Sequence, residues 1–267
     1  MKTDIAGRIA LVTGGSKGIG RRVSEMLAEE GCKVAVVARD QAAIDETVNG
    51  IVAAGGQAIG ISADLTVVEN YQVAVDACKA AFGAPEIAVY NMTAPDPGGF
   101  EDVNDDDFRQ AYHLVQICYI NMVRAVLPGM QAAGWGRVVT IGSGTAKAPL
   151  RSTPYFSYVL ANAHRAGAVG LNKTLAVDYG HHGITFNTVG VGAIATEQAK
   201  QWIAARAEES GVTYDEVFDG FFANNPVKRA GQPDEVAAMV VYLSSNLSGY
   251  TTGETILCDG GMAECFP

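Results

Sequence analysis

The chain has 267 residues, of which 48% are hydrophobic and only 18% are charged. This composition favours a compact globule over a disordered chain. Its formal net charge is −10, with 19 Lys and Arg against 29 Asp and Glu. That balance argues against nucleic acid as a partner, because phosphate backbones are bound by basic surfaces.

The cysteines and the apolar segments bear on the protein's location. Five cysteines are scattered along the chain without the paired spacing of a zinc site or a disulfide framework. No run approaches the ~18 apolar residues of a membrane span, and the first residues do not resemble a signal peptide. We therefore expect a cytoplasmic protein with reduced thiols, no membrane contact and no bound metal.

Seven short runs of apolar and β-branched residues alternate with longer segments of helical pattern. These runs cover residues 8–14, 33–38, 58–65, 86–91, 137–143, 184–192 and 254–260. The alternation predicts an α/β fold, a doubly wound parallel sheet of about seven strands with helices on both faces. No linker, repeat or low-complexity segment divides the chain, so residues 1–267 are predicted to form a single Rossmann domain.

Two segments depart from this alternation. Residues 91–108 are rich in Pro, Gly and Asp, which predicts a loop leading to a helix capped by its acidic residues. Residues 197–230 form a helical insertion before the last strand, with several aromatic side chains that look exposed: Trp202, Tyr214, Phe218, Phe221 and Phe222. Both segments follow carboxyl ends of strands, where ligands bind in such sheets, so the insertion is predicted to be a substrate lid.

A glycine-rich loop follows the first predicted strand and opens a helix. The stretch "TGGSKGIG" supplies the candidate cofactor contacts Gly14, Ser16, Lys17, Gly18, Ile19 and Gly20. Glycines in this position let the backbone turn tightly and approach a pyrophosphate, which the free N–H groups of the helix then bind. The strand, loop and helix together indicate dinucleotide binding.

The end of the second strand distinguishes the two nicotinamide cofactors. An NAD-binding protein would place an acidic residue on the ribose hydroxyls, where this chain has Ala38. Arg39 follows it, and Lys17 lies in the glycine loop, so two cations converge where a 2′-phosphate would bind. The alternative is that Arg39 pairs with Asp40 on the surface. We predict NADP(H).

These motifs resemble the short-chain dehydrogenase/reductase family over almost the whole chain. Further matching stretches are "SADLT", "EIAVYN", "GRVVTIGS", "NTVGVGAIAT" and the tail from residue 229. The resemblance implies that Asp64 and Leu65 flank the adenine and that Asn91 lies along the cofactor ribose. It also implies that Ile194 and Thr196 hold the carboxamide and phosphates, and that the protein is a homo-oligomer, a tetramer or a dimer.

The family's catalytic set of Asn, Ser, Tyr and Lys is incomplete in this chain. Ser143 is kept, and its ordinary alternative is a cap at a strand end. Counting back from "GLNKTLA" places Ala161 in the Tyr slot and Arg165 in the Lys slot. The Asn slot falls near the apolar Val115. Only the serine remains of the four.

Two residues are the candidates to replace what is lost. Tyr158 precedes Ala161 by three residues, about one helical turn, and its side chain would reach toward Ser143, although an aromatic residue at a helix start most often packs. Arg165 would act as a permanent cation that cannot itself exchange a proton. Other candidate donors are Tyr155, His164, His113, Lys147 and water.

The predicted function is an NADP(H)-dependent oxidoreductase with an atypical proton donor. It would move hydride between the nicotinamide and a carbonyl, imine or activated alkene of a small apolar or cyclic substrate. Two alternatives stay open, because a fold does not determine a function. One is a catalytically silent NADP(H)-binding sensor or partner subunit, and the other is a non-redox lyase, isomerase or cyclase.

Overall fold

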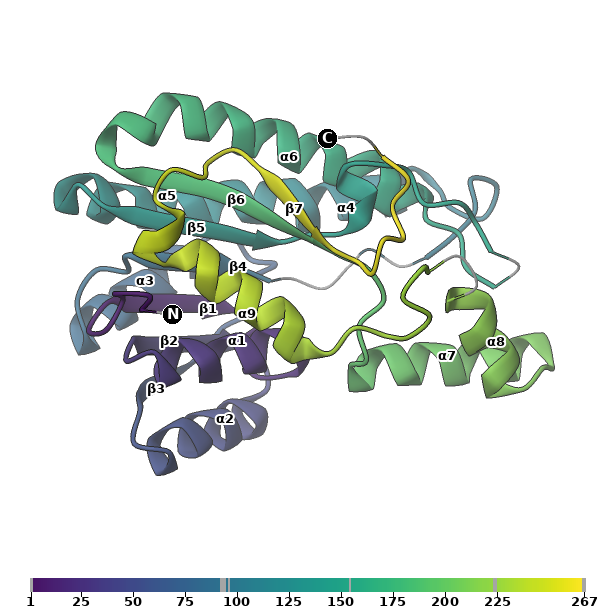
Figure 1. Cartoon of the computed structure of the whole chain (residues 1–267), viewed down its shortest axis with the longest axis horizontal. Helices are drawn as coiled ribbons and strands as arrows, with labels where there is room; N and C mark the ends of the chain where they lie inside the picture. The colour runs from purple at the N-terminus through teal and green to yellow at the C-terminus, as the bar shows by residue number, and fades with distance from the viewer. Residues whose placement is uncertain (1, 92–94, 96, 154, 223–224, 266–267) are drawn as a thin grey trace.

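The computed structural model describes residues 2–91, 95, 97–153, 155–222 and 225–265, which build a three-layer α/β structure around one parallel sheet (Figure 1). Within these residues the sheet has seven strands in the order β3-β2-β1-β4-β5-β6-β7. The strands are β1 Ile9–Thr13, β2 Lys33–Ala38, β3 Gln57–Ser62, β4 Ile87–Tyr90, β5 Gly136–Ile141, β6 Ile184–Val191 and β7 Thr255–Cys258. The predicted doubly wound sheet is confirmed.

Helices cover both faces of the sheet. They are α1 Gly18–Glu29, α2 Gln41–Ala53, α3 Asn70–Ala81, α4 Asp105–Tyr112, α5 Cys118–Ala133, α6 Val159–Tyr179, α7 Glu197–Ser210, α8 Tyr214–Phe222 and α9 Pro233–Ser244. A π-helical turn, His113–Ile117, joins α4 to α5, and a 3₁₀ turn, Gly144–Ala146, follows β5. The predicted acidic cap is present, since Asn104 and Asp107 form a capping box at the start of α4.

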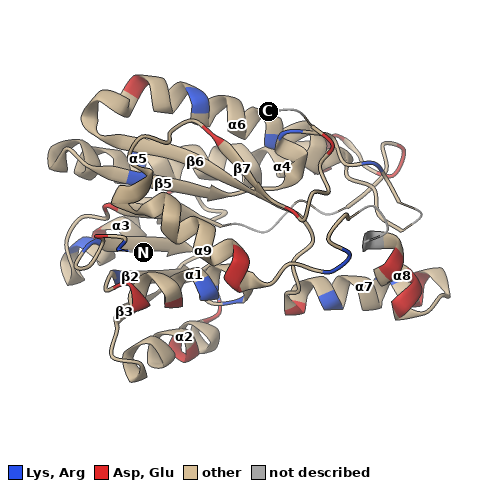
Figure 2. Ribbon diagram, in the orientation of Figure 1, with Lys and Arg blue, Asp and Glu red and all other residues tan. Residues whose placement is uncertain are grey.

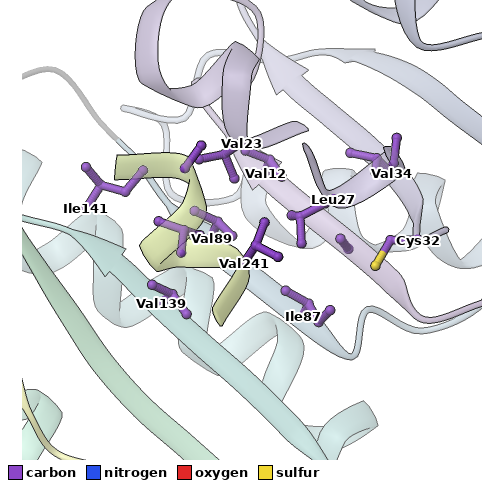
Figure 3. Close-up of a cluster of buried hydrophobic side chains, with 14 of the residues drawn as sticks. Val12, Val23, Leu27, Cys32, Val34, Ile87, Val89, Val139, Ile141 and Val241 are labelled. Carbon is purple, nitrogen blue, oxygen red and sulfur yellow. The ribbon is translucent and has the colours of Figure 1, made fainter. Parts of the chain in front are cut away.

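Two apolar clusters fill the space between the sheet and its helices. On one face, Val23 and Leu27 of α1 and Val241 of α9 pack on strand residues that include Val12 and Val139 (Figure 3). On the other face, α3, α5 and α6 cover the alternate strand residues, such as Leu11 and Val138. Neighbouring residues of a strand thus enter opposite cores, which explains why the central strands are mostly apolar on both faces.

The order of the strands reverses between β1 and β4. The chain runs from β1 to β2 and β3 on one side, then returns to place β4 on the other side of β1. In doubly wound sheets, a reversal of this kind opens a crevice at the carboxyl ends of the two strands. This switch point is where open α/β sheets bind their ligands.

The insertion before β7 forms α7 and α8, which lie beyond the carboxyl edge of the sheet (Figure 1). The acidic residues of α8, coloured red in Figure 2, are exposed, while its Val217 is buried. Trp202 and Tyr214 are partly exposed, at 37% and 36%, whereas Phe218 packs into the insertion's apolar cluster. The side chains of Phe221 and Phe222 lie outside the described part of the chain.

Two arginines stack on a tryptophan ring at the amino ends of β1 and β5. Arg8 and Arg137 lie on the Trp135 ring, at 4.0 and 4.3 Å from its centroid. The buried Arg137 donates hydrogen bonds to the carbonyls of Ser245 and Gly183. Burial and the charge of Arg8 lower its pKa to about 10, so the guanidinium stays charged at neutral pH.

Replacing this buried arginine is expected to destabilise the fold. Arg137→Met would remove the hydrogen bonds of a buried guanidinium to the Ser245 and Gly183 carbonyls, which costs about 3 kcal/mol of unfolding free energy. Urea denaturation followed by circular dichroism measures the loss. Arg109→Met, which removes an exposed arginine paired with Asp106, should change stability by less than ~0.5 kcal/mol. Equal losses in the two variants would contradict the role given to Arg137.

Candidate functional site

The glycine loop lies in the crevice between β1 and β4 and packs tightly against its surroundings. Gly14 and Gly18 have positive φ angles of 57° and 53°. A Cβ added to Gly20 would lie 2.1 Å from the Gly14 carbonyl oxygen. No side chain caps the start of α1 at Lys17, so the first N–H groups of the helix are available to an anion, as dinucleotide binding requires.

Asn91, which follows β4, stabilises the glycine loop through two hydrogen bonds. Its backbone N–H donates to Thr13 Oγ1 at 2.8 Å, and its side-chain amide donates to the Gly14 carbonyl at 3.3 Å. The sequence resemblance placed Asn91 along the cofactor ribose. In the structure, this residue also fixes the shape of the turn that would receive the pyrophosphate.

Lys17 and Arg39, the two cations predicted to bind the 2′-phosphate, have different surroundings. Lys17 Nζ lies 2.7 Å from Asp40 Oδ2, and this contact, with the cap that Asp40 provides to α2, holds the pKa of Asp40 below its usual value. Arg39 is exposed and has no ion pair within the described ranges. The alternative pairing of Arg39 with Asp40 is therefore not observed. Arg39 is the cation left available at the end of β2.

The other predicted cofactor residues lie in the glycine loop or follow the carboxyl ends of β3 and β6. Asp64 accepts hydrogen bonds from Thr66, which lower its pKa, and Leu65 beside it is buried. Thr196 caps α7, and its methyl group would lie 3.3 Å from a Cβ on Gly18. The remaining three predicted positions are Ser16, which is buried, Ile19, which packs on the core, and Ile194, which bridges to Gly231.

Ser143 stands at the carboxyl end of β5, half-buried, and begins a 3₁₀ turn. Its Oγ accepts a hydrogen bond from the Thr145 N–H at 3.3 Å. The capping role considered from the sequence is thus present. The hydroxyl proton is not used by this bond, so Ser143 retains a donor for a substrate oxygen.

Ala161 occupies the position of the family's catalytic tyrosine, and the side chain of Tyr158 does not take its place. Tyr158 is the N-cap of α6, with φ −124° and ψ 27°. Because it precedes the first helical turn, the expected alignment one turn before Ala161 is not realised. Its ring packs on the cluster of Phe156, Ile203 and Val217, and this burial raises the pKa of the phenol.

Arg165 lines a small cavity beneath the end of β5. The cavity has a volume of ≈ 20 Å³ and is lined by residues of the π-helical turn, α6 and the strands β4, β5 and β6. Its polar lining comes from Tyr90, Thr140, Arg165 and Thr188. The Tyr90 hydroxyl donates a hydrogen bond to the Leu114 carbonyl oxygen, which links β4 to the π-helical turn. Burial raises the pKa of Tyr90 well above its usual value.

The other candidate donors have contacts of their own. His113 Nε2 lies 2.7 Å from the Thr66 carbonyl oxygen, and His164 lies against Phe108 and Tyr112, where burial lowers its pKa. Tyr155 packs beneath Gly220 of α8. Lys147 is exposed and lies in a groove beside β7. These contacts do not single out any of the four side chains as the proton donor in place of Tyr158.

Tyr90 and Thr140 were not among the residues expected from the sequence. Tyr90 precedes Asn91 at the end of β4, where the family has an asparagine, and Thr140 is a polar residue at a buried position of β5. A polar side chain in a run of buried positions is the signal that would have found Thr140. Nothing in the local pattern indicates that both would face Arg165, because this contact depends on the crossing of α6 over the sheet.

The described residues contain no group of three His, Cys, Asp or Glu placed to hold a metal ion. Over the same residues, no helix combines the length and the apolar character needed to cross a membrane.

Comparisons with known proteins agree with this geometry. A family model described as Enoyl-(Acyl carrier protein) reductase matches residues 14–263. The chain is 31% identical to the 3-oxoacyl-[acyl-carrier-protein] reductase of Vibrio harveyi, covering 97% of this chain and 98% of the relative. It is 32% identical to the short-chain reductase protein NovJ of Streptomyces niveus, covering 95% and 93%.

A solved structure shows the same arrangement of elements. L-sorbose reductase from Gluconobacter frateurii, complexed with NADPH and L-sorbose, matches with a TM-score of 0.91 and 25% identity over 100% of both chains. The family model and the relatives each cover nearly all of the chain, and the sheet order and glycine loop agree with them. The chain belongs to the short-chain dehydrogenase/reductase family.

Proposed function

We propose that the protein is an NADP(H)-dependent reductase that acts without the family's usual tyrosine acid. It would transfer hydride between the nicotinamide and a carbonyl, imine or activated alkene of a small apolar or cyclic substrate. The observation that carries the proposal is the crevice at the β1–β4 switch point, with an intact glycine cradle on one side and Ser143 on the other.

The residues of the crevice fit a dinucleotide phosphate. A Cβ at Gly14 or Gly20 would collide with Asn91 or with the Gly14 carbonyl, so only glycine permits the tight turn on which a pyrophosphate would bind. Arg39 is exposed, makes no ion pair among the described residues and has only the charge of Asp64 acting on it, so it can pair with a 2′-phosphate. The L-sorbose reductase structure that resembles this chain was solved with NADPH. These observations support NADP(H) over NAD(H) as the cofactor.

The cofactor, Ser143 and the insertion would each contribute to the reaction. The bound cofactor would supply or accept the hydride. Ser143 would orient the substrate oxygen by a hydrogen bond, while the apolar cluster formed by the insertion and Phe156 would exclude water from the cleft.

Binding and turnover are tested separately. NADPH is titrated by its fluorescence, and its absorbance is then followed with panels of ketones, imines and enones. We expect NADPH binding and turnover on at least one class, with kcat/KM lowered ~10-fold by Ser143→Ala, the effect of losing one neutral hydrogen bond. Tight binding without turnover on any panel, or turnover unaffected by Ser143→Ala, would contradict the proposed reductase.

A catalytically silent NADP(H)-binding sensor or partner subunit is the second candidate. Two features favour it. Ala161 stands where the family has its catalytic tyrosine, and the glycine loop that would bind the cofactor is complete. This candidate predicts NADPH binding without turnover, so the same titration separates the two. A non-redox lyase, isomerase or cyclase would instead convert its substrate with no change in NADPH absorbance.

A further inference from the structure

The chain that follows β7 is folded by one buried carboxylate. Asp259 is only 8% exposed. Its Oδ1 accepts a hydrogen bond from the Gly261 N–H at 2.9 Å, and its Oδ2 accepts one from the Ala263 N–H at 2.8 Å. Bonds of this kind, from a backbone N–H to a charged oxygen, are stronger than those between neutral groups. Asp259 therefore determines the path of residues 259–263, which we call the tail segment.

The tail segment covers the 3₁₀ turn that Ser143 begins, here called the serine turn. A Cβ added to Gly144, the residue after Ser143, would lie 3.6 Å from Asp259 Oδ2 and 3.6 Å from the Ala263 Cβ, an ordinary packing distance. Gly144 and Thr145 of this turn are buried. One wall of the serine turn is thus formed by Asp259 and by the residue whose N–H it accepts.

The end of β6 packs closely against both Ser143 and Asp259. A Cβ at Gly190 would lie 3.2 Å from the Ser143 carbonyl oxygen, and a Cβ at Gly192 would lie 2.8 Å from the Asp259 Cα. The Gly192 N–H also donates to the Cys258 carbonyl at 3.2 Å. The two glycines allow this close approach, so the serine and the aspartate are held against the same strand end.

The tail segment also supports the insertion. Gly260 and Gly261 have φ angles of 66° and 82°. A Cβ on Gly260 would lie 2.6 Å from Asn225 Oδ1, and one on Gly261 would lie 3.1 Å from Pro226 Cγ. The Val227 N–H donates to the Gly260 carbonyl at 3.3 Å. Residues 225–227, the stem by which the insertion returns to α9, therefore rest on the tail segment.

We infer that Asp259 is a positioning residue for Ser143. By folding the tail segment over the serine turn, it holds the Ser143 hydroxyl where the substrate oxygen would bind, and it connects that position to the stem of the insertion. This inference rests on the proposed reductase function, in which Ser143 orients the substrate oxygen. Because the tail occupies both oxygens of its carboxylate, Asp259 acts through the turn and not on the substrate.

The size of the effect has an upper limit. Ser143 Oγ accepts the Thr145 N–H, so the direction of its hydroxyl follows the serine turn. A shift of ~1 Å in a residue outside the chemistry can lower a rate by up to ~10²-fold. Asp259 acts only through Ser143, however, so its loss cannot cost more than the ~10-fold expected from losing the serine's own hydrogen bond.

Replacing the carboxylate by an amide of the same size tests the inference. Asn offers one acceptor oxygen, so Asp259→Asn leaves the Gly261 or the Ala263 N–H facing an NH₂ group. We expect kcat/KM on the substrate class that the panels identify to fall by ~3- to 10-fold, with the Kd for NADPH unchanged. Asp76→Asn is the matched control. It alters an exposed carboxylate that accepts a hydrogen bond from Gln72 on α3 and should retain full activity.

A double-mutant cycle separates positioning from a general loss of structure. If Asp259 acts through Ser143, Asp259→Asn should lower kcat/KM in the native background and cause no further loss in the Ser143→Ala background. An equal loss in both backgrounds would show that Asp259 affects the reaction by another route, and this would overturn the inference.

Hydrogen exchange tests the same contact without turnover. In Asp259→Asn, peptides from the serine turn, residues 142–149, and from the stem, residues 225–231, should exchange ~5-fold faster than in the native protein, the effect of one lost hydrogen bond. The β5 peptide, residues 136–141, should not change. Ala263→Gly removes only the methyl group packed beside Gly144, and it should accelerate exchange in the serine turn even if Asp259→Asn does not fold.

The outcomes distinguish this inference from the proposed reductase. Unchanged exchange of the serine turn in Asp259→Asn and in Ala263→Gly would overturn the inference, whatever the activity. A native protein that binds NADPH but turns over none of the panels would count against the reductase and against any catalytic role of Asp259. Faster exchange of the serine turn in that case would leave Asp259 with a purely structural task.

Discussion

Replacing Gly20 by alanine is expected to weaken NADPH binding by ~10²-fold or more, because a displaced phosphate loop loses several charge-assisted hydrogen bonds at once. The new Cβ would lie 2.1 Å from the Gly14 carbonyl oxygen and 2.6 Å from the side-chain amide of Asn91. Contacts below 3.0 Å with backbone atoms require the loop to move. The Kd for NADPH, measured by fluorescence titration, reports the loss.

A second glycine provides the control for this substitution. Gly50 lies within α2, and a Cβ at this position meets no atom within 4 Å. Gly50→Ala should therefore leave the Kd unchanged and raise the free energy of unfolding by about 0.5–1 kcal/mol, since alanine is the better helix former. NADPH binding by Gly20→Ala with native affinity would show that the cofactor does not approach this loop closely.

The sheet was predictable because its signals are local. Each strand is a short apolar run that ends in a turn, and right-handed crossovers place the intervening helices on the two faces of the sheet. The glycine loop was equally readable, since Gly14, Gly18 and Gly20 occur immediately between a strand and a helix. A close backbone approach leaves few residue types available, so the sequence records it directly.

The catalytic side of the crevice was less predictable because its contacts are not local. The count along α6 places Ala161 and Arg165 in the family's slots, but the position of Tyr158 depends on where the helix begins. The structure starts α6 at Val159, so Tyr158 lies before the first turn and packs on the insertion. The place of Thr140 in the cavity beside Arg165 becomes visible only when α6 and β5 are brought together.

The packing of Tyr158 and the charge of Arg165 have a common consequence. Tyr158 would contribute proton transfer if it reached the substrate. Arg165, which keeps its positive charge beside Tyr90, would contribute electrostatic stabilisation. These two contributions to a rate are separable, and substitutions at Arg165 and Tyr158 should separate them experimentally.

Replacing Arg39 by alanine is expected to remove most of the preference for NADPH over NADH. Arg39 is exposed at the end of β2 without an ion pair in the described part of the chain, whereas Lys17 is engaged by Asp40. A charge-assisted hydrogen bond contributes about 1.5–3 kcal/mol, so the ratio of the two Kd values should fall by roughly 10- to 100-fold. The change should come from weaker NADPH binding, since NADH carries no 2′-phosphate for Arg39 to contact.

Salt dependence distinguishes this contact from a general charge effect. Because Arg39 is exposed, its attraction for a phosphate should weaken as added salt screens it. The preference of the native protein should therefore decline between low and high ionic strength, and that of Arg39→Ala should not. Arg124→Ala removes another exposed arginine, on α5, and should leave the preference unchanged. If Arg39→Ala kept the native ratio, the 2′-phosphate would have to be held elsewhere, and Lys17 released from Asp40 would be the next residue to replace.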